Sequence, residues 1–476
     1  MSIIGNFFQN SVPGIDFGQS KKKAATDKQT DIEPSDQFIP RDNQTEEKAV
    51  KREETKEKNT EPVIRKDNQT EKNTVSVADK GNTSEEVSSS PPAPKEWTVL
   101  FFANGNCDPT MDYELTRAIE GAGLIGSDKN INFAAQISHI KNDGAANRFY
   151  IDKPEIKGKH RDREIKLKDY EELGKTNMGD GETLKNFLLW GMKKYPAKHY
   201  MVLMGGHGGA FLGCLPDNIA KDHLDNEEIA GALKEVTRET GQKLDIMAFD
   251  ACFMACAETA FALKDSVDYM VGPEEMNYGN SWNYWALAEK MTYRASQSEL
   301  TVPGVMDIAL EAQEHFTLKA ELNLKNMPEL VQLLKNFSEK LINTQTPPGI
   351  IKKAFRKAQH FSQGAIRNQT ADPNAHVKPY EDMRDLISLT RQIKNSQEIK
   401  DEELKKAANS IEQMWGKIFI KGFTTDGLGL DDCHGMAIYA PVKGAEYYIK
   451  DYQENTLFNK ETGWLEVVKK YGTENS

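Results

Sequence analysis

The chain of 476 residues has few cysteines, no long apolar run and no excess of positive charge. Its 5 cysteines are scattered and form no C-x-x-C pair, which argues against a disulfide framework or a zinc finger, so we expect reduced thiols. No apolar run approaches the roughly 20 residues that span a bilayer. Because the net charge is -12, neither nucleic acid nor an anionic membrane is expected as the main partner.

The first residues also lack the basic start and the sustained apolar run of an ordinary secretory signal. We therefore expect a cytoplasmic protein, or one exported by a route without a cleaved signal peptide. Residues 1–95 have almost no aromatic side chains after Phe38 and are rich in polar and charged residues. Such a segment buries too little apolar surface to offset its ordering entropy, so we predict a disordered polar leader.

Two short apolar runs stand out in the rest of the chain, residues 200–204 and 244–249. Both are continuous rather than alternating, which is typical of strands that are buried on both faces. Between them Ile229, Leu233 and Val236 recur at helical spacing. Strand, helix and strand predict a parallel βαβ unit. Further alternation of strands and helices predicts an α/β sheet layered by helices.

Reactive residues follow both apolar runs: Gly-Gly-His207-Gly-Gly after the first and Asp250-Ala-Cys252 after the second. The carboxyl ends of parallel strands meet at one edge of a sheet, so we expect His207 and Cys252 to lie together. Cys252 is expected to open a helix, whose N-terminus lowers the pKa of a thiol. His207 can then act as general base and acid for a cysteine nucleophile. The backbone N–H groups of Gly208 and Cys252 are candidates for an oxyanion hole.

Most of these residues also have a structural interpretation. An isolated cysteine is usually a small buried hydrophobe, and we interpret Cys256, one helical turn after Cys252, in that way. Asp250 fits the N-cap of a helix starting at Ala251. Alternatively, strand alternation puts residues 250 and 252 on one side, where the Asp250 carboxylate selects a basic substrate side chain.

Three further residues receive no function from the pattern. Cys107 follows a turn, is expected to be exposed and has no base beside it in the sequence. His223 is expected in a solvated loop. His434 precedes a late strand and has no evident partner.

Taken together and in this order, the motifs resemble the clostripain family of cysteine peptidases, in the caspase-like clan. The resemblance covers residues 96–290 well and continues weakly to the end. It is carried by residues 97–100 (WTVL), 177–184 (NMGDGETL), 195–200 leading to His207-Gly-Gly, 244–255 with Glu258, 268–275 (DYMVGPEE) and 435–439 (GMAIY).

The resemblance implies a caspase-like α/β/α sandwich around a mostly parallel sheet, and a clostripain-like cysteine endopeptidase with a His207–Cys252 dyad. It also implies cleavage after Lys or Arg, with Asp250 in the pocket for the basic side chain. Some relatives hold that side chain with an acidic residue near the position of Asn280, so the amide implies a broader choice than strict Arg. Family members are often cut between the histidine and cysteine elements. Lys221 is the matching site here, and it is equally well an ordinary surface lysine.

Composition and pattern divide the chain into the leader (residues 1–95), a catalytic domain that the resemblance makes caspase-like (residues 96–295) and a helical extension (residues 296–476) that returns to the sheet with a final strand and helix. Calcium dependence occurs in the family, but Asp426, Asp431 and Asp432 are too loosely spaced for an EF-hand loop. We expect no required cofactor and no metal ligands. The expected partner is a protein or peptide substrate, for a monomer that processes itself.

Two other classes of protein stay open at this point. One is a non-catalytic caspase-like scaffold that binds a partner through its tail or its helical region. The intact His207 and Cys252 argue against it. The other is a cysteine hydrolase or acyltransferase that does not act on peptide bonds.

Overall fold

The computed structural model of the chain describes six segments, all from residue 93 onwards. They are residues 93–157, 162–276, 282–313, 319–361, 382–423 and 430–473. From Pro94 onwards these segments belong to one compact unit. Residues 1–92 of the predicted leader, Asn280 and Asp426 lie outside the described residues.

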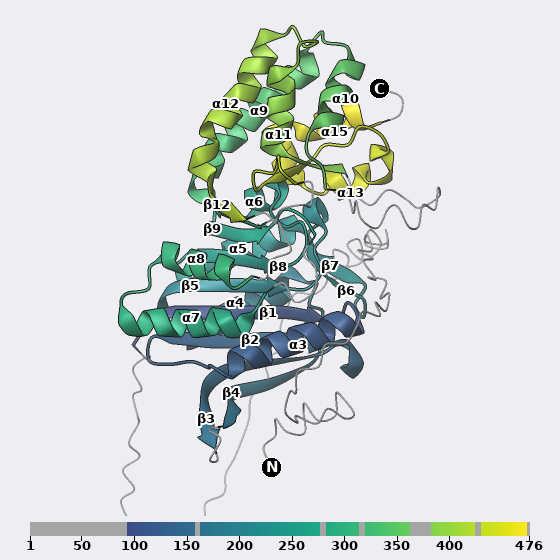
Figure 1. Cartoon of the computed structure of the whole chain (residues 1–476). Helices are drawn as coiled ribbons and strands as arrows, with labels where there is room; N and C mark the ends of the chain where they lie inside the picture. Colours follow the sequence, from purple (N-terminus) through teal and green to yellow (C-terminus); the bar gives the residue numbers. More distant parts are fainter. Residues whose placement is uncertain are drawn as a thin grey trace, which may run out of the picture. The chain divides into compact units, whose positions relative to one another are not determined.

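A nine-stranded sheet lies at the centre of the described part, in the order β12-β10-β9-β8-β5-β1-β2-β3-β4 (Figure 1). The strands are β1 (Lys95–Gly105), β2 (Ile131–His139), β3 (Ala145–Lys157), β4 (Asp162–Lys175), β5 (Ala197–Gly205), β8 (Leu244–Asp250), β9 (Val267–Pro273), β10 (Lys319–Asn323) and β12 (Phe419–Phe423). The central strands β2, β1, β5, β8 and β9 pair in parallel, and antiparallel strands flank them at both edges.

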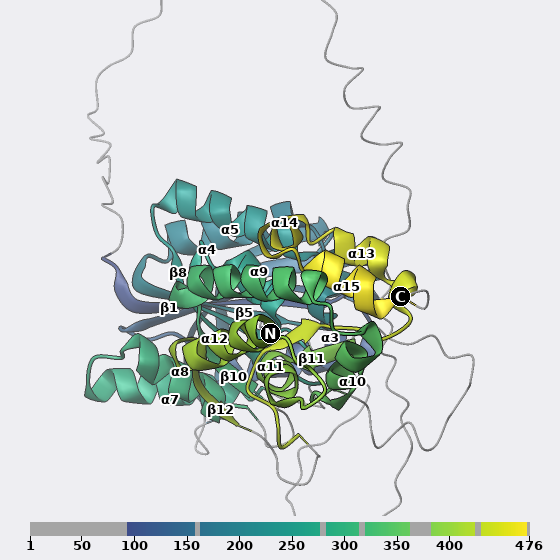
Figure 2. The same cartoon turned by 90° about the horizontal axis from the view of Figure 1, so that it is seen from above.

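Helices cover both faces of this sheet, because its central strands are apolar on both faces. Val99 and Phe101 of β1 pack toward α3 (Pro109–Gly123), α7 (Tyr284–Gln297) and α8 (Val302–Glu311). The alternate residues Leu100 and Phe102 pack toward α4 (Gly181–Lys194), α5 (Asn226–Thr240) and α6 (Ala257–Leu263). Figure 2 shows α4 and α5 on one side of the strands and α7 and α8 on the other. The predicted α/β/α sandwich around a mostly parallel sheet is confirmed.

The C-terminal region is largely helical and gathers beyond the β12 edge (Figure 1). Its helices are α9 (Met327–Asn343), α10 (Pro348–Lys357), α11 (Leu386–Asn395), α12 (Glu402–Ile418), α13 (Ile449–Gln453), α14 (Thr456–Thr462) and α15 (Trp464–Gly472). No helix in the described ranges combines the length and the apolar character that crossing a bilayer requires.

This region joins the main sheet differently from the prediction. The late strand β13 (Ala437–Tyr439) pairs with β11 (Met383–Asp385) in a separate two-stranded sheet. Instead, β10 pairs with β9 and β12 pairs with β10. Because β10 already occupies the edge of β9, β13 has no place there, and the Ala437 N–H donates to the carbonyl of Ala255 at 2.9 Å.

The charged stretch before α4 forms two long strands. β3 and β4 pair as an antiparallel ribbon. Opposite charges face each other across its outer part, as in the pair Lys166–Glu155 at 2.8 Å. Such cross-strand pairs allow a strand that is polar on both faces, which a search for apolar runs overlooks.

Candidate active site

Three loops meet at the carboxyl edge of the parallel strands. In the register of the sheet, Ala103 of β1 lies beside Gly205 of β5, and Gly205 lies beside Asp250 of β8. The chain leaves all three strands at this edge. It therefore brings the loop after β1, the His207 loop and the Cys252 loop to one place.

The His207 and Cys252 loops are in direct backbone contact at Gly208. A Cβ atom on Gly208 would lie 2.0 Å from the carbonyl oxygen and 2.8 Å from the nitrogen of Cys252. One residue earlier, the Gly206 N–H donates to the carbonyl of Asp250 at 3.1 Å. Only glycine fits at position 208, so the double-glycine pattern reflects this close approach of two loops.

The N–H group of Gly208 is not used by the bridge to the segment after it. The Leu215 N–H donates to His207 O and the Gly209 N–H donates to Gly213 O, both at 2.8 Å. These bonds flank Gly208, which occupies a non-hydrogen-bonded position of this short antiparallel bridge. Its own N–H therefore points away from the bridge, and the Cys252 backbone is the neighbour at Gly208.

His207 is held by a carboxylate that the sequence analysis did not single out. Its Nε2 lies 2.7 Å from Oδ2 of Asp108, and the two side chains are 19% and 16% exposed. Oδ1 of Asp108 caps α3 by accepting from the N–H groups of Thr110 and Met111 at 2.8 and 2.9 Å. Burial alone would raise the pKa of Asp108, but the hydrogen bonds from His207 and the helix hold it below the usual value. The only local signal was an Asp-Pro pair, which is typical of a helix start.

Cys107 lies beside this pair and is buried, in contrast to the predicted exposure. Its Sγ donates to the carbonyl of Asn104 at 3.4 Å. Ligand atoms of Cys107, Asp108 and His207 lie within 4.8 Å of one another. Burial, and then the charge of Asp108, raise the pKa of the Cys107 thiol. The exposure expected for Cys107 was wrong because the loop after β1 is bonded to the segment after β5. Asn104 Nδ2 donates to the carbonyls of Leu215 and Pro216, both at 3.0 Å. The Asn218 amide donates to the carbonyl of Cys107.

Cys252 does not open a helix, which corrects the prediction. It lies half-buried in a turn, and α6 begins at Ala257 with Cys256 at the N-cap. The chain turns at Phe253, whose φ is 61°. The Phe253 N–H then donates to Glu275 O at 3.1 Å, beside the end of β9. The helix N-terminus therefore does not act on the Cys252 thiol, and Asp250 caps no helix at Ala251.

Asp250 and Cys252 contact different sides of the sheet. Oδ2 of Asp250 accepts a hydrogen bond from the hydroxyl of Tyr284, on the α7 side, at 3.2 Å. Cys252 packs against the core on the α4 and α5 side. Strand alternation does not extend from residue 250 to residue 252, because β8 ends at Asp250. Burial and the neighbouring Asp250 raise the pKa of Tyr284, which keeps this phenol a hydrogen-bond donor.

Cys256 is a fully buried core residue, as predicted. Next to it, the buried carboxylate of Glu258 accepts hydrogen bonds from the Tyr452 hydroxyl at 2.8 Å and from the Tyr439 N–H at 3.1 Å. Burial raises the pKa of Glu258. These bonds join the segment after the candidate nucleophile to the C-terminal region.

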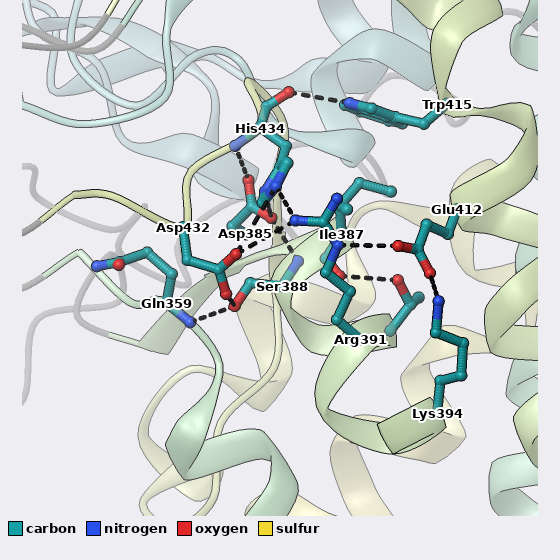
Figure 3. Close-up of polar contacts among 11 residues, drawn as sticks. Gln359, Asp385, Ile387, Ser388, Arg391, Lys394, Glu412, Trp415, Asp432 and His434 are labelled. Atoms are coloured by element: carbon teal, nitrogen blue, oxygen red, sulfur yellow. Dashed lines mark hydrogen bonds and ion pairs between the residues drawn. The ribbon is translucent and has the colours of Figure 1, made fainter. Parts of the chain in front are cut away.

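His434 has partners, contrary to expectation, in a polar cluster of the C-terminal region (Figure 3). Its Nδ1 lies 3.0 Å from Oδ1 of the buried Asp385. Arg391 contacts Asp432 at 3.4 Å and Glu412 at 2.9 Å. The partners of His434 lie far away in the chain, which is why the sequence did not reveal them.

This cluster reaches the active-site edge through Glu274, which follows β9. Its Oε2 accepts from the Gly435 N–H at 2.8 Å. Burial, and then the charge of Asp385, raise the pKa of Glu274. The neighbouring Glu275 is 6% exposed, and burial raises its pKa to about 7. Two buried carboxyl groups thus follow β9, and the backbone carbonyl of Glu275 accepts from Phe253 in the turn that carries Cys252.

The remaining predicted residues are not all at this edge. Lys221 is exposed, with a φ of 59°, in the turn between β6 (Cys214–Asp217) and β7 (Asp222–Leu224). His223 is buried rather than solvated, because its backbone packs against Gly179.

In the described part of the chain, Asp431 and Asp432 belong to no group of three metal-ligating side chains. Asp426 and Asn280 fall in stretches that the structure does not describe.

An α/β/α sandwich in which a histidine loop and a cysteine loop abut at the carboxyl edge of neighbouring parallel strands has the architecture of caspase-like proteins. A family model described as the clostripain family matches residues 139–471. The chain belongs to the clostripain family of cysteine peptidases.

Individual proteins are similar to parts of this chain or to its fold. Clostripain of Hathewaya histolytica is 28% identical over 147 residues, which is 27% of this chain and 28% of that protein, so less than a third of its length is matched. An inactive zymogen C11 protease from Parabacteroides distasonis has a similar fold, with a TM-score of 0.56 and 16% identity over 78% of this chain and 99% of that one. A secreted C11 cysteine protease from Bacteroides thetaiotaomicron, solved with an irreversible peptide inhibitor, also has a similar fold. Its TM-score is 0.53 and its sequence identity is 15%, over 78% of this chain and 99% of that one.

Proposed function

We propose that this protein is a cysteine endopeptidase that cleaves after Lys or Arg through Cys252 and His207. The observation that carries the proposal is the contact between the two loops, where Gly208 lies against the backbone of Cys252. Of the 5 cysteines, all of them described, only Cys252 and Cys433 are not buried. Cys252 is the one that joins the His207 loop at the carboxyl edge of the sheet.

The reaction needs four steps. The Cys252 thiolate attacks the carbonyl carbon of the scissile bond and forms a C–S bond, while the Gly208 and Cys252 N–H groups stabilise the oxyanion. His207 then gives a proton to the leaving nitrogen as the C–N bond breaks. Water loses a proton to His207 and attacks the resulting thioester. The C–S bond then breaks, which releases the carboxylic acid product and regenerates the Cys252 thiolate.

Asp108 is a positioning residue in this proposal. Because it engages Nε2 of His207, Nδ1 is the ring nitrogen that exchanges protons with Cys252 and the substrate. The cap on α3 fixes the carboxylate, so the ring orientation is determined before substrate binds. A carboxylate that fixes the tautomer and stabilises the imidazolium is a common device in such enzymes.

Asp250 supports the basic preference. Its half-buried carboxylate lies at the end of β8 on the α7 side, where Tyr284 fixes one of its oxygens, so the substrate side chain has to reach it around the end of this strand from Cys252. A partly desolvated carboxylate attracts a Lys or Arg side chain more strongly than a solvated one does. With the amide of Asn280 in place of a second acid, we expect Lys and Arg to be accepted to similar extents.

Self-processing at Lys221 is part of the proposal. Lys221 is exposed in a turn between the two catalytic loops, which is the kind of site that a peptidase can reach. One protein with this fold was described as an inactive zymogen, which agrees with activation by cleavage. We expect the purified chain to yield two fragments, the Cys252→Ala and Lys221→Gln variants to stay intact, and activity to persist in a metal chelator.

Covalent labelling tests the central claim. A peptidyl electrophile that ends in lysine or arginine should modify the wild type and the Cys433→Ser variant at Cys252, and should leave Cys252→Ala unlabelled. Release of an amine fluorophore from dibasic peptides should follow the same order. A folded chain without labelling would favour a non-catalytic scaffold, and labelling without amide cleavage would favour another cysteine hydrolase or acyltransferase.

A further inference from the structure

We propose that Cys107, Asp108 and His207 form an inhibitory site for a thiophilic divalent cation of the zinc class. They supply a thiol sulfur, a carboxylate oxygen and a ring nitrogen, all within 4.8 Å of one another, and no other such group of three occurs in the described ranges. Thiolate, imidazole and carboxylate are the ligands that zinc binds in proteins. The sequence offered no zinc motif, because Cys107 and His207 are brought together only by the neighbouring strands β1 and β5.

The distances suit a small tetrahedral ion. Zinc bonds of roughly 2.0–2.3 Å place the ligand atoms about 3.3–3.7 Å apart. Asp108 Oδ2 and His207 Nε2 now share a hydrogen bond of 2.7 Å. A cation that replaces the proton between them would increase the distance between these two atoms by less than about 1 Å. The Cys107 sulfur lies within 4.8 Å of both atoms, so its approach is also about 1 Å at most. Such shifts lie within ordinary side-chain movement.

The charge at this place also favours a cation. With Cys107 deprotonated, the thiolate and the Asp108 carboxylate carry two negative charges, which match a divalent ion. Metal binding displaces the thiol proton, as it does at other thiolate sites in proteins.

The loop holds two of the three ligands in place without a metal. Asp108 is fixed by its cap on α3, and the Asn218 amide donates to the carbonyl of Cys107. Asn104 braces the start of the loop, since its Oδ1 accepts from the Asn106 N–H and the Ser138 hydroxyl, both at 2.9 Å. Binding therefore orders little, while the partial exposure of Asp108 and His207 gives an ion access.

The inhibitory effect rests on the proposed function, whereas binding does not. A histidine with a metal on Nε2 keeps its proton on Nδ1 and no longer accepts one from water or Cys252. General base and acid catalysis would stop although Cys252 is untouched. A soft thiolate ligand favours zinc, and hard ions such as calcium and magnesium are not expected to bind here.

Cobalt spectroscopy on the full chain tests binding without relying on activity. Titrating Co²⁺ into Cys252→Ala should produce the near-ultraviolet thiolate-to-cobalt band, since Cys107 is still present. The band should be lost when Cys107→Ser is added, and should persist when Cys433→Ser, a change at the other half-exposed thiol, is added instead. Adding Asp108→Asn, which preserves a helix cap, should weaken cobalt affinity at least about tenfold.

Inhibition by buffered Zn²⁺ is the second measurement. The inhibition constant should rise at least about tenfold in Cys107→Ser, and a chelator should restore full activity to the wild type. A band that persists without Cys107, or that is absent from folded Cys252→Ala, overturns the proposal. If no peptidase activity exists, the cobalt result still decides whether the site binds metal.

Discussion

Gly208→Ala tests whether the contact between the two loops is the basis of catalysis. The new Cβ would lie 2.0 Å from the carbonyl oxygen of Cys252, and Cβ atoms essentially never approach closer than 3.0 Å. One of the two loops must therefore move by about 1 Å. The obstacle is backbone rather than a flexible side chain, so the shift is transmitted to His207 or Cys252.

A displacement of this size has a calculable cost. Misplacing reacting groups by about 1 Å lowers rates by roughly 10²-fold, which corresponds to about 2.7 kcal/mol of activation free energy. The oxyanion position shifts as well, because Gly208 N–H moves with the loop. We expect kcat/KM to fall by about 10²-fold, with most of the loss in kcat.

The assay compares amide cleavage of a basic peptide by Gly208→Ala with that by Gly231→Ala. Gly231 lies in α5, where an added Cβ would meet no described atom within 4 Å beyond its own helix, so alanine there should preserve the rate and add about 0.5–1 kcal/mol of helix stability. Thermal unfolding of both variants checks that they fold. If folded Gly208→Ala kept activity within about threefold of wild type, the assignment of the oxyanion site to this contact would be refuted.

Three further outcomes follow from the same edge. Asp108→Asn should lower kcat by about 10²-fold with KM nearly unchanged and should alter the pH profile, because the amide reverses the hydrogen bond to His207. Asp250→Asn should lower kcat/KM by about 10–100-fold for Lys and Arg substrates, as a peptide library would show, and much less for neutral ones. Burial raises the pKa of Glu275 from 4.5 to about 7, so its contribution to stability is full below pH 4.5 and is lost as pH rises through 7. In Glu275→Gln, urea unfolding should show roughly 2–3 kcal/mol less loss of stability between pH 5 and pH 8 than in the wild type.

The central sheet could be predicted because its signal is local. The apolar runs that became β5 and β8, and the helical spacing that became α5, are properties of short windows of sequence. The helix expected at Cys252 was wrong for a non-local reason. Carbonyls at the end of β9 accept N–H groups from Phe253 and Ala255, and this bonding diverts the chain before α6 can begin.

Side chains whose meaning depends on a distant partner were the hardest to interpret. Asp108 looked like an ordinary helix cap, because His207 lies 99 residues away. His434 and Asp385 are 49 residues apart. An acid and a histidine were visible in the sequence in each pair. No helical spacing or strand alternation connects residues that lie so far apart in the chain. The meeting of the His207 and Cys252 loops could therefore be predicted from the order of the strands. The side-chain partners of His207 and His434 could not.

The C-terminal region helps to hold the candidate active site in place. Its strand β10 covers the edge of β9, which would otherwise expose unpaired backbone groups. Glu258 and Glu274 bury carboxyl groups whose hydrogen-bond donors, Tyr452 and Gly435, come from the far end of the chain. A buried carboxyl group that loses its donors is strongly destabilising. Glu258 follows Cys252 in the chain, and Glu274 follows Pro273, whose carbonyl accepts from the Ala255 N–H at 2.9 Å. The position of the proposed nucleophile thus depends on residues more than 150 positions later in the chain.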